Sequence, residues 1–337
     1  MTFSDTDIQY MRRALQLAAA GEGHTSPNPM VGAVIVAPGR GIIGEGWHRR
    51  YGGPHAEVNA VRSVAEADRA LLPQSTIYVT LEPCSHYGKT PPCALLLRDS
   101  GFARVVVGTG DPNPRVAGRG IDMLRTAGIR VDVGLLADEC RDLNKCFFTA
   151  HTLGRPFVTL KWAQSADGFI DGHISGDLGS MIVHRRRRDA DVIVVGAGTV
   201  IADNPRLDVR HIDGPSPRPL VLDRHNLLAG SDFAIMQNPR TIHVTDGSAI
   251  TDILAGLYRD GGYISVLVEG GASVLRGFID AGLWDEAFVE CSPRSIHGKV
   301  KAPAVTSVPA DALKVGENTV YHYIGEQSLR SAEKERH

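Results

Sequence analysis

The chain has 337 residues, of which 43% are hydrophobic, and carries a formal net charge of −2 at pH 7. This length predicts two domains of about 150 residues each. The weak net charge argues against nucleic acid or an anionic membrane as a partner. No apolar run is long enough to span a bilayer, and the first residues lack the pattern of a signal peptide. The odd number of cysteines, five, is typical of a reduced, cytoplasmic protein.

The first half of the sequence alternates helical and strand patterns. We expect a helix capped by Ser4 or Asp5, followed by a hairpin of strands at 33–36 and 42–48. Further along the chain, we expect helices at 55–66 and from Pro92, strands at 76–81 and 104–108, a helix at 121–127 and a strand at 129–133. This alternation predicts a mostly parallel sheet covered by helices on both faces, with active-site residues at the carboxyl ends of the strands.

Three metal-ligating side chains fall at the ends of these elements: His55, Cys84 and Cys93. Zinc with three protein ligands keeps its fourth position for water, and helix N-termini directed at the metal favour thiolates. Glu57 is two residues after His55 and can move protons between that water and a leaving amine. The pattern predicts a zinc-dependent deaminase; a structural zinc site with His86 as fourth ligand is the alternative.

Eight residues separate the two cysteines, whereas the short deaminase signature has two. We interpret this insert as a substrate loop, in which Lys89 suits a point-charge contact to phosphate. Asn28 lies between two prolines, which hold it stiffly enough to present its amide to a ring or a sugar, although a simple turn has the same pattern. His48 is either a substrate contact or a surface histidine. Residues 111–114 form a second rigid turn at the end of a strand.

Several of these motifs together resemble the deaminase half of the bifunctional riboflavin-biosynthesis deaminase–reductases, over about residues 8–145. They are Pro27-Asn28-Pro29, Gly46-Trp47-His48, His55-Ala56-Glu57, the stretch from Glu82 to Cys93, and Asp111-Pro112-Asn113. The resemblance implies a cytidine-deaminase-like three-layer α/β/α domain with one zinc ion per chain on His55, Cys84 and Cys93, and with Glu57 as the catalytic proton carrier. It also implies a substrate, a diaminopyrimidinone bearing a ribosylamino 5′-phosphate. Its contacts would be Asn28, His48, His86, Lys89, Asp111 and Asn113, with Lys89 at the phosphate.

The second half begins after a helix predicted at 138–149 and a linker at 151–156. We place the deaminase domain at residues 1–148 and a second domain at residues 149–337. Strands are expected at 157–163, 192–196, 220–223, 241–245 and 265–269. Most of them are solid apolar runs, which are typical of strands buried on both faces of a sheet.

Two stretches of this half carry polar or glycine-rich turns after strands. The stretch 266–279 reads as a strand, a Gly-Gly turn and a helix, an arrangement that can hold a phosphate at the helix N-terminus. A plain strand-to-helix turn has the same pattern, and the Gly-x-Gly-x-x-Gly fingerprint is missing. The second stretch, 198–210, puts Thr199, Asp203 and Arg210 in one ordered loop.

These stretches resemble the reductase half of the same family, which is an α/β domain with the dihydrofolate reductase fold and uses NADPH. The resemblance implies hydride transfer from NADPH, which would reduce the ribosyl group to ribityl, and a homodimer or homotetramer formed through this domain. The implied cofactor-binding residues are Ala163, Thr199, Asp203, Gly270, Gly271, Ala272 and Ser273. The implied substrate-binding residues are Lys161, Arg187, Leu207, Arg210 and Glu269.

The departures from the family pattern all lie in this second half. The loop between Gly168 and Ile174 is shorter than usual, and His173 stands where the family often has a tryptophan. Arg224 replaces a small residue; it is either a contact to the 2′-phosphate of NADPH or a solvated arginine. Residues 292–298 depart from the usual Pro-x-x-x-Gly-Gly pattern.

Two alternatives follow from these observations. In one, the protein is only a deaminase, and its second half is a binding or dimerisation module with weak catalysis. In the other, the deaminase acts on a different base, such as adenosine in tRNA or cytidine. The weak net charge, the lysine in the long loop and the entire second domain argue against the second alternative.

Overall fold

The computed structural model describes residues 3–87, 91–113 and 116–326. The chain divides into two compact units, Met1–Leu153 and Gly154–His337, a boundary slightly later than the one placed after residue 148. The helix expected at 138–149 is two helices, the second of which continues to Leu153. The linker prediction for 151–153 is therefore wrong. The helices separate at Asn144, whose side-chain amide makes two 2.8 Å hydrogen bonds to the backbone of Met30.

The first unit is a five-stranded sheet of strand order β2-β1-β3-β4-β5. Its elements up to the middle of the unit are α1 (Asp5–Ala19), β1 (Gly32–Ala37), β2 (Gly41–Trp47), α2 (Ala56–Ser63), the 3-10 helix η1 (Glu66–Gln74) and β3 (Thr76–Leu81). The others are α3 (Cys93–Asp99), β4 (Arg104–Thr109), α4 (Arg119–Thr126), β5 (Arg130–Val133), α5 (Ala137–Leu143) and α6 (Lys145–Leu153).

This sheet is mixed: the predicted hairpin of β1 and β2 is confirmed, and the expectation of a mostly parallel sheet is met by β3 to β5. The pairs β3–β4 and β4–β5 are parallel, whereas β1 is antiparallel to both β2 and β3. The reason is the hairpin: a short turn reverses the chain between β1 and β2, so that these strands need no crossover helix. The carboxyl ends of β3 and β4 still meet at one edge, where residues 84 and 111 follow them.

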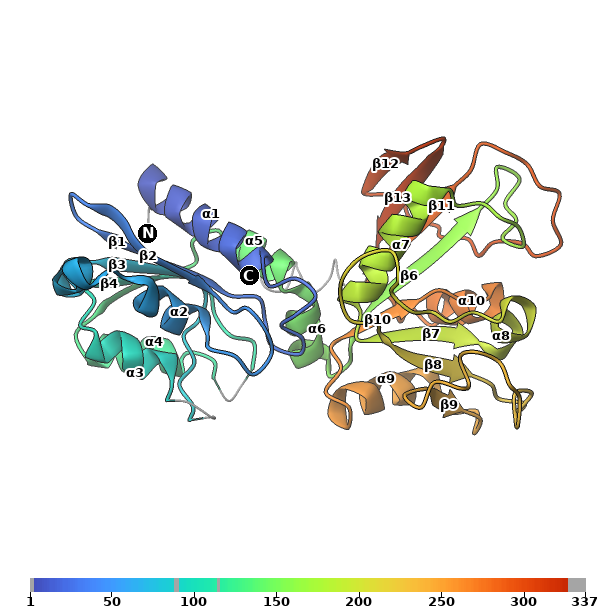
Figure 1. Ribbon diagram of the computed structural model, residues 1–337, viewed down its shortest axis with the longest axis horizontal. Helices are drawn as coiled ribbons and strands as arrows, with labels where there is room; N and C mark the ends of the chain where they lie inside the picture. Colours follow the sequence, from blue (N-terminus) through green and yellow to red (C-terminus); the bar gives the residue numbers. More distant parts are fainter. Residues whose placement is uncertain (1–2, 88–90, 114–115, 327–337) are drawn as a thin grey trace. The chain divides into compact units, whose positions relative to one another are not determined.

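Helices cover both faces of this sheet, as the three-layer expectation requires. The helices α2, α3 and α4 pack on one face and α1 and α5 on the other (Figure 1). Side chains alternate along β3: Ile77 and Val79 belong to the core under α2 to α4, and Tyr78 to the core under α1. Ile77 and Val79 are completely buried, and Tyr78 is 4% exposed.

In this unit, the predicted first residues of the helices agree with the structure more closely than the predicted last residues. Ser4 caps α1, since its Oγ accepts the N–H of Asp7 at 3.1 Å. His55 is the residue before α2, and Pro92 precedes α3 rather than forming its first turn. The helix from residue 55 ends at Ser63 and not near residue 66, because the next residue has extended backbone that leads into η1.

The second unit is an eight-stranded sheet of order β12-β13-β11-β6-β10-β7-β8-β9. Its first elements are β6 (Phe157–Gln164), α7 (Asp177–Asp189), β7 (Val192–Gly196), α8 (Ala197–Asp203), β8 (Arg218–Leu222), β9 (Ile242–Val244) and α9 (Ile250–Arg259). The remainder are β10 (Ser265–Val268), α10 (Ala272–Asp280), β11 (Glu286–Cys291), β12 (Asp311–Val315) and β13 (Asn318–Ile324).

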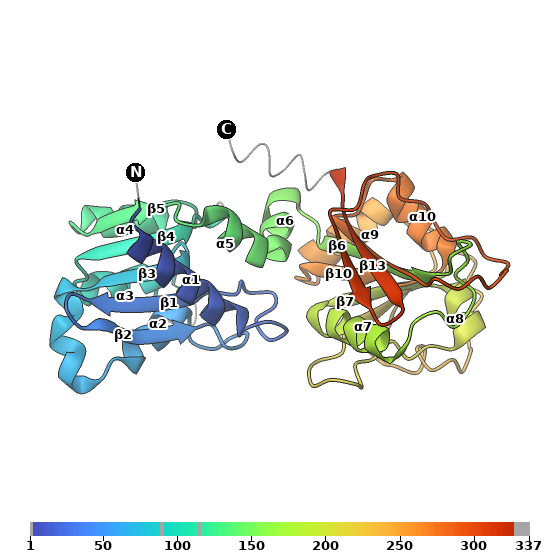
Figure 2. The ribbon, with the colours of Figure 1, turned by 90° about the horizontal axis from the view of Figure 1, so that it is seen from above.

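All five strands predicted for this unit are present, and they run parallel where they pair with one another. The added strand β11 is parallel to β6, and β12 and β13 form an antiparallel edge. The helices α7 and α8 lie on one face and α9 and α10 on the other (Figure 2). The stretch 198–210, expected as a loop, is helical up to Asp203 because Asn204 ends α8 in the left-handed conformation.

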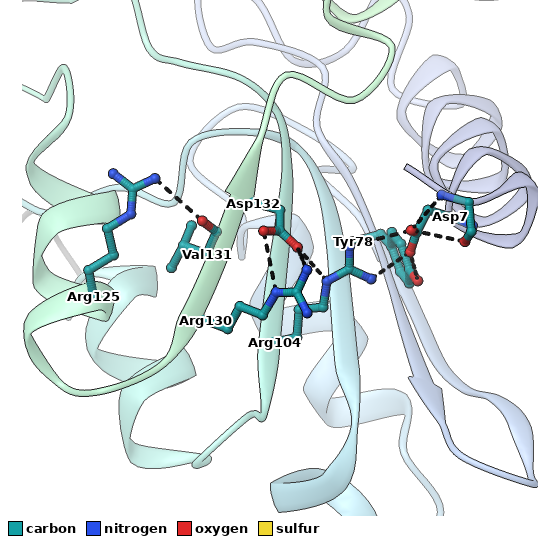
Figure 3. A network of polar contacts seen from close by, with 8 residues as sticks. Asp7, Tyr78, Arg104, Arg125, Arg130, Val131 and Asp132 are labelled. Atoms are coloured by element: carbon teal, nitrogen blue, oxygen red, sulfur yellow. Dashed lines mark hydrogen bonds and ion pairs between the residues drawn. The ribbon is translucent and has the colours of Figure 1, made fainter. Parts of the chain in front are cut away.

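One polar network joins four elements of the first unit, α1, β3, β4 and β5 (Figure 3). Arg104 of β4 lies between two carboxylates, donating to Asp7 of α1 at 2.6 Å and to Asp132 of β5 at 2.6 Å. Tyr78 also donates to Asp7 at 2.7 Å. Burial alone would raise the pKa of Asp7, but the hydrogen bonds from Arg104, Tyr78 and Ser4 hold it well below its usual range. Both carboxylates thus accept hydrogen bonds from the Arg104 guanidinium.

We predict that Arg104→Met lowers the free energy of unfolding of the first unit by about 3 kcal/mol, because it leaves the buried Asp7 carboxylate without its cation and Asp132 with only the exposed Arg130. Arg130→Met is the matched control. Its guanidinium also contacts Asp132, at 3.1 Å, but its side chain is 68% exposed, so we expect a change below about 0.5 kcal/mol. Urea unfolding followed by amide hydrogen exchange in β3 to β5 measures this unit separately. Equal effects of the two variants would contradict the prediction.

Candidate active sites

The three predicted metal ligands converge in the first unit. His55 directly precedes α2, Cys84 follows β3, and Cys93 opens α3. The His55 Nδ1 atom is 3.6 Å from Cys84 Sγ and 3.4 Å from Cys93 Sγ, and all three ligand atoms lie within 4.8 Å of one another. Zinc bonds of about 2.0–2.3 Å at tetrahedral angles require ligand atoms about 3.5 Å apart. The donor set and its spacing therefore fit a zinc ion.

The sulfur atom of Cys84 is prepared to carry negative charge. The thiol of Cys93 and its backbone N–H, at 3.3 Å, both hydrogen-bond to the Cys84 sulfur. The thiol hydrogen bond is the main reason why the pKa of Cys84 falls to about 4, in spite of burial. A thiolate is the form of cysteine that binds metal, so Cys84 has the required protonation state before any cation enters.

Glu57 lies in the first turn of α2 and is only 3% exposed. Burial raises the pKa of its carboxyl to about 7. A carboxyl group with a pKa near neutral can both accept and release a proton during one reaction cycle. Glu57 is not one of the three residues of the ligand cluster. Its carboxyl group is therefore available to carry protons.

His48 and Asn28 form a pair beside the cluster. His48 Nδ1 donates to the carbonyl oxygen of Pro54 at 3.0 Å, so that Nε2 is the acceptor for the Asn28 amide at 3.2 Å. The ring centroids of His48 and His55 are 5.5 Å apart. With 2% exposure, His48 is buried and is not the surface histidine of the alternative interpretation. Burial lowers its pKa, which keeps the ring neutral.

The turn after β4 carries Asp111 and Asn113, both half-buried. The Asp111 carboxylate accepts the N–H of Asn113 at 2.8 Å, and burial raises its pKa to about 6. His86 is exposed and lies outside the group of ligand atoms within 4.8 Å, so the structural-site alternative finds no support from it. Lys89 lies outside the described residues, and its phosphate contact stays a prediction.

Glu82 holds this turn in place, a role that the sequence did not reveal. Its carboxylate is 4% exposed and accepts backbone N–H groups from Gly118 and Gly120, both at 3.0 Å, and from Asp111 at 3.3 Å. In the sequence, the only indication of this role was the position of Glu82 two residues before Cys84. The hydrogen bonds connect the Asp111 turn to the strand end that carries the ligand Cys84.

The second unit contains a cavity of about 1040 Å³ at the carboxyl ends of β6, β7 and β10. Ten of the twelve residues predicted for the reductase site line it: Lys161, Ala163, Arg187, Thr199, Asp203, Arg210, Glu269, Gly271, Ala272 and Ser273. The residues come from four strands and helices that are far apart in the sequence. Their convergence gives this unit a pocket of the size and polarity that a cofactor and a substrate need.

The other two predicted residues lie elsewhere. The Leu207 side chain is buried in the core beside α8, at 5% exposure, and does not line the cavity, so its contact with the substrate stays a prediction. Gly270 is buried behind the cavity, where a Cβ atom would come within 2.8 Å of Val195; its small size serves packing. Arg224 is exposed, donates to His225 at 3.1 Å and does not line the cavity.

Charges in the cavity are arranged in pairs. Arg187 of α7 makes a bidentate ion pair with Glu269, at 2.8 and 2.7 Å. Lys161 of β6 lies nearby; burial lowers its pKa, while Glu269 and Glu290 oppose that shift. Both ion-pair partners were predicted from the sequence as separate substrate contacts, and only the fold shows that they hold each other. The basic run at 185–188 thus serves the cavity through Arg187.

Comparison with known proteins defines the class of each unit. Residues 4–109 match the family model of the cytidine and deoxycytidylate deaminase zinc-binding region, and residues 156–324 match that of the RibD C-terminal domain. The protein therefore joins a cytidine-deaminase-like domain to a reductase-like α/β domain. Among the described residues, no helix is long and apolar enough to cross a membrane.

Full-length relatives have the same two domains. The chain is 41% identical to riboflavin biosynthesis protein RibD of Bacillus amyloliquefaciens over 88% of this chain and 87% of that protein. It is 36% identical to the Escherichia coli protein of the same name, over 95% and 99%. The crystal structure of the Thermotoga maritima diaminohydroxyphosphoribosylaminopyrimidine deaminase/5-amino-6-(5-phosphoribosylamino)uracil reductase superposes with a TM-score of 0.86 at 36% identity, covering 95% of this chain and 98% of that one.

The chain belongs to the RibD family. It is a bifunctional deaminase and reductase of riboflavin biosynthesis. A RibD structure from Acinetobacter baumannii agrees, with a TM-score of 0.85 at 32% identity over 95% of this chain and 99% of that one.

We predict that Cys84→Ser weakens zinc binding by more than about a hundredfold, since even changes behind the ligands cost 10- to 100-fold in affinity. The measurement is zinc content by atomic emission, with competition against a chelator. Cys146→Ser is the control, because Cys146 is a half-buried cysteine outside the ligand cluster. One zinc per chain retained in Cys84→Ser would contradict the assignment.

Proposed function

We propose that the first unit hydrolytically deaminates 2,5-diamino-6-ribosylamino-4(3H)-pyrimidinone 5′-phosphate, and that the second unit reduces the ribosyl group of the product. The final product would be 5-amino-6-ribitylaminouracil 5′-phosphate. The observation that carries the proposal is the pairing of two sites: three zinc ligands beside a buried glutamate, and a large cavity lined by the expected reductase residues. The relative from Thermotoga maritima bears the names of both activities.

In the deaminase site, His55, Cys84 and Cys93 would hold zinc, which when bound supplies the Lewis acidity that activates water. Glu57 takes a proton from the attacking water and delivers it to the amine that leaves. Its buried position, with a pKa raised to about 7, supports both steps. Exclusion of bulk water around Glu57 also keeps the proton on this path.

The substrate ring and ribose would lie between two polar pairs. The Asn28 amide is oriented by His48 at 3.2 Å, and the Asp111 carboxylate is oriented by the N–H of Asn113 at 2.8 Å. These side chains are held before the substrate arrives, which lowers the entropy cost of binding. We propose that the insert between the cysteines adds the contacts of His86 to the sugar and of Lys89 to the phosphate.

In the reductase site, NADPH would supply the hydride. We propose that Thr199, Asp203 and the N-terminus of α10 hold it, because Gly271 begins this helix with φ of 65° and leaves backbone N–H groups facing the cavity. Lys161, Arg210 and the Arg187–Glu269 pair would face the substrate. A cavity of about 1040 Å³ is larger than a small substrate alone needs, which favours a working reductase over a weak binding module.

The assembly and the location of the protein stay predictions. We propose a homodimer or homotetramer that forms through the second unit, in the cytoplasm, and light scattering of the purified protein tests the assembly. A monomer at micromolar concentration would contradict this part of the proposal and leave both activities standing.

We predict that Glu57→Gln keeps one zinc per chain and lowers the rate of ammonia release by about 10²- to 10⁴-fold, because the amide cannot move a proton. The assay supplies the diaminopyrimidinone ribosylamino phosphate and follows ammonia. Reduction of the separately prepared deaminated product is the internal control, and it should proceed at the wild-type rate. Wild-type ammonia release by the variant would end the assignment of Glu57.

We predict that Glu269→Gln lowers kcat/KM for NADPH oxidation by about a hundredfold, since removal of one charge from a buried pair leaves Arg187 uncompensated in the cavity. Ammonia release should stay unchanged. Glu286→Gln is the matched control: Glu286 is a buried glutamate of the same sheet that does not line the cavity. A wild-type protein that releases ammonia but oxidises no NADPH would instead favour the deaminase-only alternative.

A further inference from the structure

Six consecutive residues, 170–175, form one side of the reductase cavity, and we call them the wall segment. This is the region where the chain is shorter than its family pattern. The second departure from that pattern, at residues 292–298, is far away in the sequence. In the structure the two departures lie together, because residues 294–302 run beside the wall segment and the turn before it; we call 294–302 the clasp segment.

Asp171 fastens the beginning of the wall to the clasp. Its carboxylate accepts the backbone N–H of Lys299 at 2.6 Å on Oδ2 and that of Val300 at 3.0 Å on Oδ1. The Ile170 N–H donates in return to the Val300 carbonyl at 3.0 Å. The N–H groups of Lys299 and Val300 lower the pKa of the Asp171 carboxyl, so both of its oxygens stay available as acceptors.

The turn before the wall is held in the same way. The Asp167 carboxylate accepts the N–H of Ile296 at 3.1 Å and of His297 at 2.9 Å. Backbone hydrogen bonds from Ala166 to Arg294 and from Ala302 to Gly168, both 2.9 Å, enclose these contacts. Two aspartates thus satisfy four N–H groups of the clasp.

The contact between wall and clasp is close enough to require glycine. A Cβ atom on Gly298 would overlap Asp171 Oδ1, and one on Gly172 would come within 2.9 Å of Ile296 Cδ1. Gly298 does not have a positive φ, so its need for glycine is a matter of space and not of backbone conformation.

The other end of the wall is tied to Glu290 of β11. Ser175 Oγ donates to one carboxylate oxygen at 2.5 Å, and Asn318 Nδ2 donates to the other at 2.6 Å. Asn318 also donates to the Ile174 carbonyl at 3.1 Å. Glu290 is 3% exposed and interacts electrostatically with Lys161 in the cavity, so the same carboxylate joins the wall to a proposed substrate contact.

We propose that Asp171 and Glu290 are positioning residues of the reductase, which hold the wall segment fixed between the clasp segment and β11. The inference rests on the proposed reductase function. A wall fixed before binding removes the cost of ordering it around cofactor and substrate, so its loss should raise KM values more than it lowers kcat.

The test measures KM and kcat for NADPH and for the deaminated pyrimidine in full-length variants. Asp171→Ala should raise both KM values by about tenfold and change kcat by less than about threefold, since misplaced binding groups cost affinity first. Asp171→Asn keeps one acceptor oxygen and should have an intermediate effect. Gly298→Ala removes no polar group but displaces Asp171, so it should reproduce the effect of Asp171→Ala. Hydrogen exchange at Lys299 and Val300 should accelerate in all three.

A second variant tests the other end of the wall. Glu290→Gln places an N–H₂ group against the donors of Ser175 or Asn318 and removes the charge beside Lys161. We expect KM for the pyrimidine to rise about tenfold, with a smaller change in KM for NADPH. Asp246→Ala is the control for the series, because Asp246 also accepts a backbone N–H, from Ser248 at 3.0 Å, on an exposed turn that does not line the cavity.

The outcomes separate this inference from the proposed function. An active wild type whose Asp171→Ala and Gly298→Ala variants keep both KM values within twofold of the control would overturn the inference alone. A lower melting temperature with unchanged KM values would do the same, because it shows a purely structural role. A wild type that neither binds nor oxidises NADPH would overturn the proposed reductase and this inference with it. Deaminase activity should be unchanged in every variant.

Discussion

The deaminase site depends on one geometric constraint: three ligand atoms from three separate elements must meet within a few ångströms. This constraint is met because glycine residues allow the helices to pack very closely against the neighbouring strand and turn. The helix α2 lies against β2 so tightly that a Cβ atom on Gly46 would come within 2.5 Å of the Ala56 carbonyl, and this contact places His55 at the start of α2. In the same way, a Cβ atom on Gly120 of α4 would overlap the carbonyl oxygen of Pro83, the residue before Cys84. Neither helix could approach with a larger residue.

Buried charge is the second organising feature, and in both units it is satisfied by groups from distant parts of the chain. Glu82 gathers backbone N–H groups of the Asp111 turn, and Glu290 gathers Ser175 and Asn318. A buried carboxylate without such donors would cost several kcal/mol. The same requirement therefore fixes the shape of each loop and connects it to a residue of each candidate site: Cys84 of the possible metal-ligand cluster and Lys161 in the lining of the cavity.

The reductase cavity follows from parallel strands. Because β6, β7 and β10 are parallel, their carboxyl ends open on one edge, and the first residues of the following segments converge there. The pairing of Arg187 with Glu269 leaves the cavity polar without a large excess of charge. The shortened loop still forms part of its lining, which agrees with an intact reductase domain in a member of this family.

The sequence by itself predicted the cluster of His55, Cys84 and Cys93, the nearby Glu57 and most strands, because these signals are local: residue type, the spacing of motifs, and apolar runs. It also indicated ten of the residues that line the reductase cavity, through resemblance to a family. Only the tertiary structure decided the antiparallel place of β1, the break at Asn144 and the burial of Leu207 in a core. It alone revealed Glu82, Asp171 and Glu290, since their partners are 28 to 129 residues away in the chain. Hydrogen bonds over such separations leave no periodic pattern, and only the folded chain brings donor and acceptor together.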